Sequence, residues 1–371
     1  MIYLILTLIL LVVLLVCFTG KPPMPVQPMP DKLILDMHCH TAGIGAGDSG
    51  CFLNERMRKS WKYPLYLGAF GSTHDEVMRE GDGAILRILS EGLRESRYVH
   101  GAVILAMDCV INEDGTEDWD RTELYIPNEF LVREFPKYDN LYYAASVHPN
   151  REDALERLEQ AKADGAVLLK WLPAIHHINV ADERYVPFYD KLAELDLPLL
   201  THVGAERSFT TADHDAGDPV RLRLPLSRGV KVIAAHMAST GKIDGQRQID
   251  RLIPLFDEFP NLYSDISSLT QINKLGFLAE SIKQEKVVPR LLYGTDMPLP
   301  RTPVTSAWYF INYLTLPQIL RIQQVKNPWD RDVLLKQALG VQPEIFQRPA
   351  DFLNIAIPAC DGATGCEQRN L

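Results

Sequence analysis

Eight short apolar runs alternate along this chain with segments of helical periodicity, and each run ends in a polar residue or a turn. The runs cover residues 33–40, 102–108, 141–148, 166–170, 197–202, 231–236, 262–265 and 290–296. Between them, apolar residues recur at helical spacing, most clearly over 152–163 and 185–194. This alternation predicts an α/β protein with a parallel sheet closed into a (β/α)8 barrel. An open doubly wound sheet fits less well, because no glycine-rich phosphate turn follows the first strand.

The chain length agrees with one large barrel domain and short additions at both ends. Of 371 residues, 46% are hydrophobic and 23% are charged, which is typical of a packed globular protein. We expect the barrel over 33–345, a proline-rich linker over 21–32 and an extended C-terminal tail over 346–371. A helical region is expected over 319–339. The long connection 41–100 is expected to fold over the barrel mouth and to shape specificity.

The net charge of the chain indicates which kinds of partner it is expected to bind. The formal net charge is −10, which argues against nucleic-acid binding because such proteins usually carry a basic surface. A small-molecule substrate is expected instead. A homo-oligomer is compatible with the sequence, which does not fix the oligomeric state.

The N-terminal hydrophobic segment predicts a membrane anchor. Residues 2–19 contain no charge and are almost wholly aliphatic, so a helix here is expected to span a bilayer as a single pass. A cleaved signal peptide is the alternative, but the segment lacks a basic start and a cleavage site of small residues. Lys21 and Lys32 follow the span and weakly favour a cytoplasmic body, so the side of the membrane stays open.

The first strand ends in two histidines, His38 and His40, that are two residues apart. Residues i and i+2 of a strand share a face, so both imidazoles are expected to project together, as half of a divalent-metal site. Other strands also end in polar residues. The further candidates are Lys170, His202, His236 and Asp296.

Each candidate also has a purely structural explanation. His202 and His236 could be hydrogen-bonded core histidines, Lys170 a salt-bridged lysine, and Asp296 the cap of the following turn. Active sites of (β/α)8 barrels lie at the carboxyl ends of the strands. Because all of these residues fall there, in the order of one barrel, the metal-site interpretation is favoured.

The motifs His38-Cys39-His40, Thr201-His202-Val203-Gly204, Ala235-His236-Met237 and Gly294-Thr295-Asp296-Met297-Pro298 resemble those of the amidohydrolase superfamily of metal-dependent hydrolases. The likeness is closer to its amidohydrolase-related (type 2) branch, which includes decarboxylases and lactonases. It covers about residues 33–345.

By this resemblance, His38, His40 and Asp296 bind one divalent ion, most simply Zn2+, and His202 is a further ligand. His236 is either a ligand of a second ion or an acid/base group. Lys170 stands where some members carry a carbamylated lysine that bridges two ions, so one ion or two remain possible.

The expected reaction is hydrolysis. Asp296 would take the proton of a metal-activated water that attacks an amide, lactone or ester carbonyl, and His236 would polarise that carbonyl. The first alternative is a metal-dependent decarboxylase of an aromatic or unsaturated acid. An arginine reaching the metal and an aromatic pocket, to which Trp61, Tyr63, Trp171 and Trp308 could contribute, would favour it. The second alternative is a catalytically inactive, membrane-tethered binding protein.

Four further residues are weaker candidates for substrate contact. His148 ends the third run, and His176 and His177 follow the fourth. Arg207 follows the strand-five histidine and could hold a substrate carboxylate.

Overall fold

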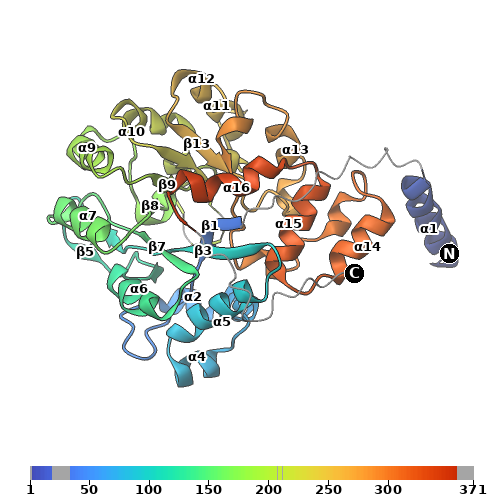
Figure 1. Ribbon diagram of the computed structural model, residues 1–371, viewed down its shortest axis with the longest axis horizontal. Coiled ribbons are helices and arrows are strands. Elements are labelled where there is room, and N and C mark those ends of the chain that lie inside the picture. Colours follow the sequence, from blue (N-terminus) through green and yellow to red (C-terminus); the bar gives the residue numbers. More distant parts are fainter. Residues whose placement is uncertain (1, 19–33, 207, 211, 357–371) are drawn as a thin grey trace.

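Eight parallel strands form one sheet in the computed structural model, which describes residues 2–18, 34–206, 208–210 and 212–356. The strands are β1 (Ile34–His40), β3 (Val99–Leu105), β7 (Leu141–Ala145), β8 (Leu168–Trp171), β9 (Leu199–Thr201), β10 (Val232–Ala234), β13 (Leu262–Asp265) and β14 (Leu291–Leu292). They are neighbours in the order of the chain. Helices surround this sheet on all sides (Figure 1).

Backbone hydrogen bonds between β1 and the segment that begins with β14 close the sheet into a barrel. Met37 N–H donates to Tyr293 O at 3.3 Å, and Asp296 N–H donates to His38 O at 2.8 Å. His40 N–H donates to Met297 O at 3.0 Å. The predicted (β/α)8 barrel is therefore confirmed, and an N-terminal helix, α1 (Ile2–Phe18), precedes it.

Alternation along the strands divides the apolar residues into two cores. The barrel interior contains Leu35, Met37, Val103, Leu105, Ala144, Leu168, Leu200, Ile233, Ala235 and Leu292. Their strand neighbours, such as Ile34, Leu169 and Leu199, belong to the larger core shared with the helices. This period of two is expected for strands that are buried on both faces.

The observed helices differ from those predicted from the sequence mainly in the C-terminal part of the chain. Those after α1 are α2 (Glu55–Lys59), α3 (Lys62–Phe70), α4 (His74–Glu80), α5 (Gly83–Arg94), α6 (Asn128–Glu134), α7 (Ala154–Ala163), α8 (Pro173–His176), α9 (Val186–Glu194), α10 (Arg223–Ser227), α11 (Gln248–Leu252), α12 (Leu255–Glu258), α13 (Phe277–Ser281), α14 (Leu316–Gln324), α15 (Pro328–Ala338) and α16 (Pro343–Phe352). The expected tail begins as the helix α16, which packs against β1 and β14. It is a helix because its apolar side chains, including Ile345 and Phe346, are buried against the barrel.

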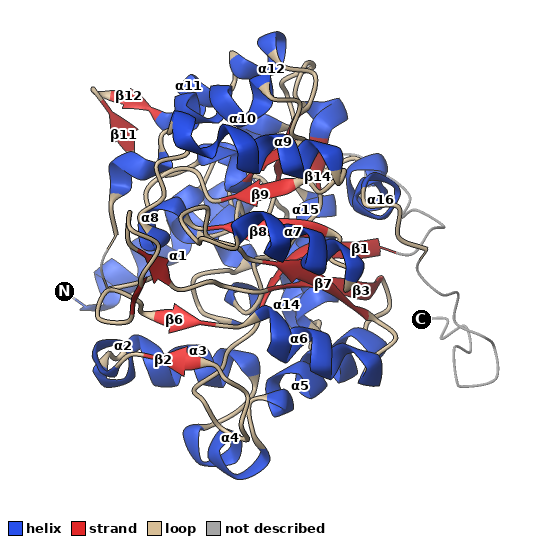
Figure 2. Ribbon diagram, turned by 90° about the vertical axis from the view of Figure 1, so that its left-hand side faces the viewer, coloured by secondary structure: helices blue, strands red, loops and turns tan. Residues whose placement is uncertain are grey.

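The long connection after β1 has its own structure. It contains α2 to α5 and the strand β2 (Phe52–Leu53), which pairs with β6 (Leu124–Tyr125) from the connection after β3. In Figure 2, α2, α3 and the β2/β6 pair lie side by side, away from the helices that follow the later strands.

The prediction of a transmembrane anchor is wrong. Within the described ranges, the structure contains no helix with both the length and the apolar character needed to cross a membrane. The helix α1 has 17 residues, so at 1.5 Å per residue it is about 25 Å long, against a hydrocarbon core of about 30 Å. The predicted single-pass membrane localisation is withdrawn with the anchor. The proposed linker 21–32 and the last part of the proposed tail, 357–371, lie outside the described residues.

Candidate metal centre

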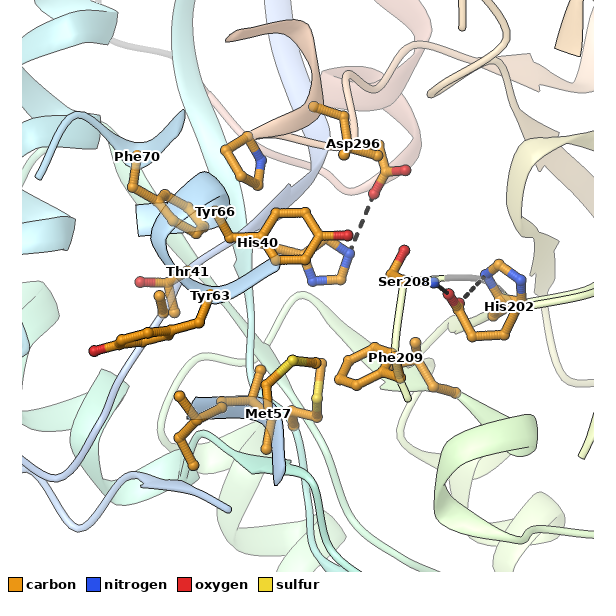
Figure 3. A pocket seen from close by; sticks show the side chains of 18 of the residues that line it. His40, Thr41, Met57, Tyr63, Tyr66, Phe70, His202, Ser208, Phe209 and Asp296 are labelled. Atoms are coloured by element: carbon orange, nitrogen blue, oxygen red, sulfur yellow. Dashed lines mark hydrogen bonds and ion pairs between the residues drawn. The ribbon is translucent and has the colours of Figure 1, made fainter. Parts of the chain in front are cut away.

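The carboxylate of Asp296 lies among three histidines at the carboxyl ends of the strands. His40 Nε2 is 3.2 Å from Asp296 Oδ1, and His38 Nε2 is 3.7 Å from the same oxygen. The other oxygen, Asp296 Oδ2, is 3.8 Å from His236 Nε2. Figure 3 shows the contact between His40 and Asp296 at one side of the pocket. The barrel therefore brings the ends of β1, β10 and β14 together.

Asp265 fixes the orientation of His38. Its Oδ2 accepts a hydrogen bond from His38 Nδ1 at 2.8 Å, and both side chains are fully buried. Because Nδ1 carries the proton in this contact, His38 Nε2 keeps its lone pair and faces Asp296. Asp265 Oδ1 also accepts from the backbone N–H of His236 at 3.0 Å, so one carboxylate positions two of the histidines.

Lys170 and His202 complete the cluster. Lys170 Nζ, at the end of β8, is 3.2 Å from His38 Nε2 and is buried. The rings of His202 and His236 have centroids 5.2 Å apart. The Nε2 atom of His202 is buried and has no hydrogen-bond partner among the described residues. A buried nitrogen of this kind is costly unless a ligand or an ion completes it.

Two residues of the cluster have a strained backbone. His236 has a φ of 57° and Asp296 a φ of 63°, in the left-handed region that residues with side chains rarely adopt. Such positions cost about 1–3 kcal/mol each and persist where the surroundings impose them. Here the N–H groups of both residues are held by hydrogen bonds to Asp265 and to His38 O.

The environment favours neutral imidazoles beside an ionised carboxylate. Burial lowers the pKa of His38 to about 4, with a further lowering by the Lys170 charge, and burial lowers the pKa of His236 well below its usual range. Burial also lowers the pKa of Lys170 to about 8, although nearby carboxylates oppose this. For Asp296, burial raises the pKa, but His236, His40 and His38 together hold it well below its usual range.

These residues fit a metal ion. Two groups, His38/His40/Asp296 and His38/His236/Asp265, each have three ligand atoms within 4.8 Å of one another. Neutral imidazoles with one carboxylate are typical ligands of divalent transition metals. The uncompensated Nε2 of His202 supports the same conclusion. The sequence correctly singled out residues that the structure places together, but the role of each as a ligand stays a prediction.

A pocket of about 170 Å³ opens directly on this cluster. His40, Lys170, His202, His236 and Asp296 line one part of it. The apolar lining includes Leu53, Met57, Tyr63, Tyr66, Leu67, Phe70, Leu172 and Phe209, much of it from the connection 41–100. In Figure 3, Tyr63, Tyr66, Phe70 and Met57 lie on the side of the pocket opposite His202. Of the four aromatic residues suggested by the sequence, Tyr63 alone lines the pocket.

Sequence reasoning missed several polar residues of the pocket, among them Glu206, Gln271 and Lys274. Glu206 is buried, and its Oε2 lies 3.4 Å from His202 Nδ1. Its position four residues after His202 could have suggested this contact. Gln271 and Lys274 lie in the segment after β13 and also line the pocket. No motif in the sequence marks either of them.

The weaker substrate-contact candidates lie elsewhere. His148 Nε2 is 2.9 Å from His176 O, and both histidines are buried. His177 has a left-handed φ of 57° at the end of α8. None of these three histidines is among the described residues that line the pocket. Arg207 lies outside the described residues.

Strand-end histidines and an aspartate at the mouth of a (β/α)8 barrel define a metal-dependent enzyme class. The family model described as amidohydrolase matches residues 92–318, which is more than half of the chain. The chain therefore belongs to the amidohydrolase family, as the sequence motifs predicted. No curated protein sequence matches it.

Several solved structures are similar in fold. An uncharacterised TIM-barrel protein from Bordetella bronchiseptica is 17% identical, with a TM-score of 0.52, and the match covers 83% of this chain and 99% of that chain. A putative 2-pyrone-4,6-dicarboxylic acid hydrolase from Pseudomonas putida is 13% identical, with a TM-score of 0.48 and coverages of 87% and 97%. A dihydroxybenzoic acid decarboxylase from Polaromonas sp. JS666, with bound manganese and an inhibitor, is 15% identical, with a TM-score of 0.46 and coverages of 87% and 97%. The first of these likenesses supports the barrel fold.

Proposed function

We propose that this protein is a metal-dependent hydrolase that cleaves a C–N or C–O bond next to a carbonyl group in a small, largely apolar molecule. The observation that carries the proposal is the cluster around Asp296: His38, His40 and His236 within 4 Å of its carboxylate, with Lys170 and an unpaired His202 nitrogen beside them. Membership of the amidohydrolase family supports it.

The ion would be held by His38, His40, Asp296 and His202, with His236 available to a second ion. Imidazole and carboxylate ligands suit Zn2+, and Mn2+ is the alternative. When bound, such an ion lowers the pKa of a coordinated water toward about 7 and polarises a carbonyl group. The buried Lys170 amine, with its lowered pKa, is suited to add carbon dioxide and release a proton, which would give a bridging carbamate.

The chain's own residues supply the proton transfers and the binding. Asp296 accepts the proton of the attacking water as the new C–O bond forms, then returns that proton to the leaving nitrogen or oxygen as the old bond breaks. His236 is positioned by Ser267 Oγ, 2.7 Å from its Nδ1, and presents Nε2 towards the same space, where the neutral imidazole would polarise the carbonyl by a hydrogen bond from Nε2. The aromatic and aliphatic residues of the pocket hold the apolar part of the substrate and exclude bulk water.

Decarboxylation of an aromatic or unsaturated acid is the second candidate. The aromatic side of the pocket, with Tyr63, Tyr66 and Phe209, favours it. In that reaction Asp296 would deliver a proton to the carbon that loses carbon dioxide. Among the described residues that line the pocket, the cationic side chains are those of Lys170 and Lys274.

Metal content tests the proposal. Elemental mass spectrometry on the purified protein and on His38→Ala, Lys170→Ala and Asp296→Ala should show one or two transition-metal ions in the wild type and fewer in the variants. Lys336→Met is the matched control, because Lys336 is a buried lysine that pairs with Asp332 outside the site. Two ions that fall to one or none in Lys170→Ala would indicate a bridging lysine.

A product assay then separates the two reactions. Lactones, esters and amides of small aromatic acids are compared with the acids themselves, by acid release in the first case and carbon dioxide release in the second. One ion that survives Lys170→Ala, with carbon dioxide as the product, would favour the decarboxylase. A wild type that takes up no metal after reconstitution would contradict both.

A further inference from the structure

Lys274 is a buried cation in the wall of the pocket. It ends the short 3-10 helix Ile272–Lys274, in the segment that follows β13. The residue is 6% exposed, whereas its neighbours Ile272 and Leu275 are 50% and 43% exposed. The chain therefore turns this one charged residue inward, towards the pocket that it lines.

The hydrogen-bonding capacity of Lys274 is largely unused. An ammonium group has three donors, and the hydrogen bond found for Lys274 Nζ among the described residues goes to Ser268 Oγ at 2.5 Å. No ion pair of Lys274 occurs in the described part of the chain. A buried ammonium that no carboxylate contacts is unfavourable, and an anion bound in the pocket would pair with it.

Gln271 adds a second unused donor on the same side. Its Nε2 is buried without a hydrogen-bond partner among the residues that the structure describes. Lys274 N–H donates to Gln271 O at 2.9 Å, so one 3-10 turn joins the two residues. Both side chains line the pocket, so two donors from one turn face one cavity.

The nearby carboxylates have contacts of their own. Asp296 is in contact with His40, Asp265 with His38, and Glu206 accepts from Ser208 N–H at 2.6 Å. They reduce the net charge around Lys274 but do not contact it directly in the described residues. A ligand carboxylate, with four lone-pair sites, would satisfy the free donors of both Lys274 and Gln271.

We propose that Lys274 and Gln271 form a carboxylate-binding site, so that the substrate is a small carboxylic acid whose apolar body contacts the aromatic side of the pocket. This inference rests on the proposed function for its meaning as a substrate site. In this proposal the turn after β13 selects the substrate, whereas the cluster around Asp296 carries out the reaction. Lys274 is a binding residue here and takes no part in proton transfer.

Ligand binding followed by fluorine NMR tests this site without any turnover. The probes are 4-fluorobenzoate and its neutral counterpart 4-fluorobenzamide, titrated into the full chain both metal-loaded and after chelation. The wild type should bind the benzoate at least about tenfold more tightly than the benzamide, and Lys274→Met should abolish this preference, because a buried charge-assisted hydrogen bond contributes about 10- to 100-fold in affinity. Lys274→Arg should restore part of it.

Two further variants keep the test decisive. Gln271→Leu should weaken benzoate binding several-fold and leave benzamide binding unchanged. Lys283→Met removes an exposed lysine nine residues further along, outside the pocket, and should behave as the wild type. If Lys274→Met does not fold, Gln271→Leu decides the question by itself.

Three results would overturn the inference. The first is equal binding of the two probes by the wild type, and the second is an unchanged preference in Lys274→Met and Gln271→Leu. The third is a wild-type preference for the benzoate that is present only in the metal-loaded protein, which would assign the effect to the ion. A protein that takes up no metal but keeps the lysine-dependent preference would contradict the proposed hydrolase and leave this site standing.

Discussion

At the scale of single residues, the positions of the candidate ligands His38 and His236 depend on polar side chains that form hydrogen bonds with them. Asp265 is the clearest case, because it accepts hydrogen bonds from His38, from the backbone of His236 and from Ser267. It lies 227 residues from His38 in the sequence. A carboxylate behind a ligating histidine fixes both its tautomer and the direction of its free nitrogen.

Asp265→Asn should lower metal affinity by about 10- to 100-fold while the barrel stays folded. The amide can donate to His38 Nδ1, which would move the lone pair of the ring away from the site. Competition with a fluorescent chelator measures the change. The control is Asp332→Asn, since Asp332 is equally buried but pairs with Lys336 and Tyr293. Equal metal affinity in the wild type and Asp265→Asn would disprove this role.

At the scale of elements, charged contacts connect the loops that extend the strands. The segment after β3 carries Asp108, and the segment after β7 carries Arg151, which binds both oxygens of Asp108 at 2.8 and 2.6 Å. His148 N–H also donates to Asp108, at 2.7 Å. The position of His148 is thus explained by its hydrogen bond to Asp108, which is part of the contact between these two loops.

Asp108→Asn should lower the free energy of unfolding by about 1–3 kcal/mol at pH 7, because it breaks the ion pair of Arg151 with both oxygens of Asp108 and leaves it the ion pair with the more exposed Glu117. Burial raises the pKa of the Asp108 carboxyl, but Arg151 and the hydrogen bonds hold it below the ordinary value of 3.8. The unfolded chain therefore binds the proton more readily, and the contribution present above pH 3.8 is lost on acidification below it.

Urea unfolding at pH 7 and pH 3 measures this effect, and the difference between wild type and variant should shrink at the lower pH. The control is Asp190→Asn, which breaks an exposed pair with Arg228 and should change stability little. A difference that is the same at both pH values would show that the ion pair is not its cause.

At the scale of the whole molecule, the two ends of the barrel differ. One end carries the candidate metal centre, and the other is covered by packed apolar side chains. The cluster around Asp296 lies at the carboxyl ends of the strands, whereas α16 packs on β1 and β14, and Leu353 just after it belongs to the interior core. The Phe346 ring lies 5.2 Å from that of Tyr293. Residues 343–352 are therefore part of the barrel domain.

Phe346→Ala should lower the free energy of unfolding by about 3–5 kcal/mol, because it leaves a cavity where a fully buried ring was packed. Thermal and urea unfolding measure the change. Glu344→Ala, at an exposed position of the same helix, is the control and should have little effect. Equal stability of Phe346→Ala and the wild type would mean that α16 is not required for the barrel.

The sequence by itself determined the barrel and most of the cluster, because both depend on local periodicity. Lys170 and His202 continue the inward alternation of Leu168 and Leu200, so their place at the strand ends follows from the pattern alone. At the N-terminus, local sequence gave a wrong prediction. The apolar composition there suggested a membrane span but did not determine whether the helix was long enough to form one.

Only the tertiary structure decided how the cluster is completed. Strict alternation from Leu35 and Met37 would turn His38 away from the interior, but the pairing of β1 with β3 shifts register between Asp36 and Cys39. His236 likewise takes its place through a left-handed backbone. Glu206, Gln271 and Lys274 reach the pocket through loops. Such irregular backbone is held by contacts between distant segments, and a local sequence pattern does not contain those contacts.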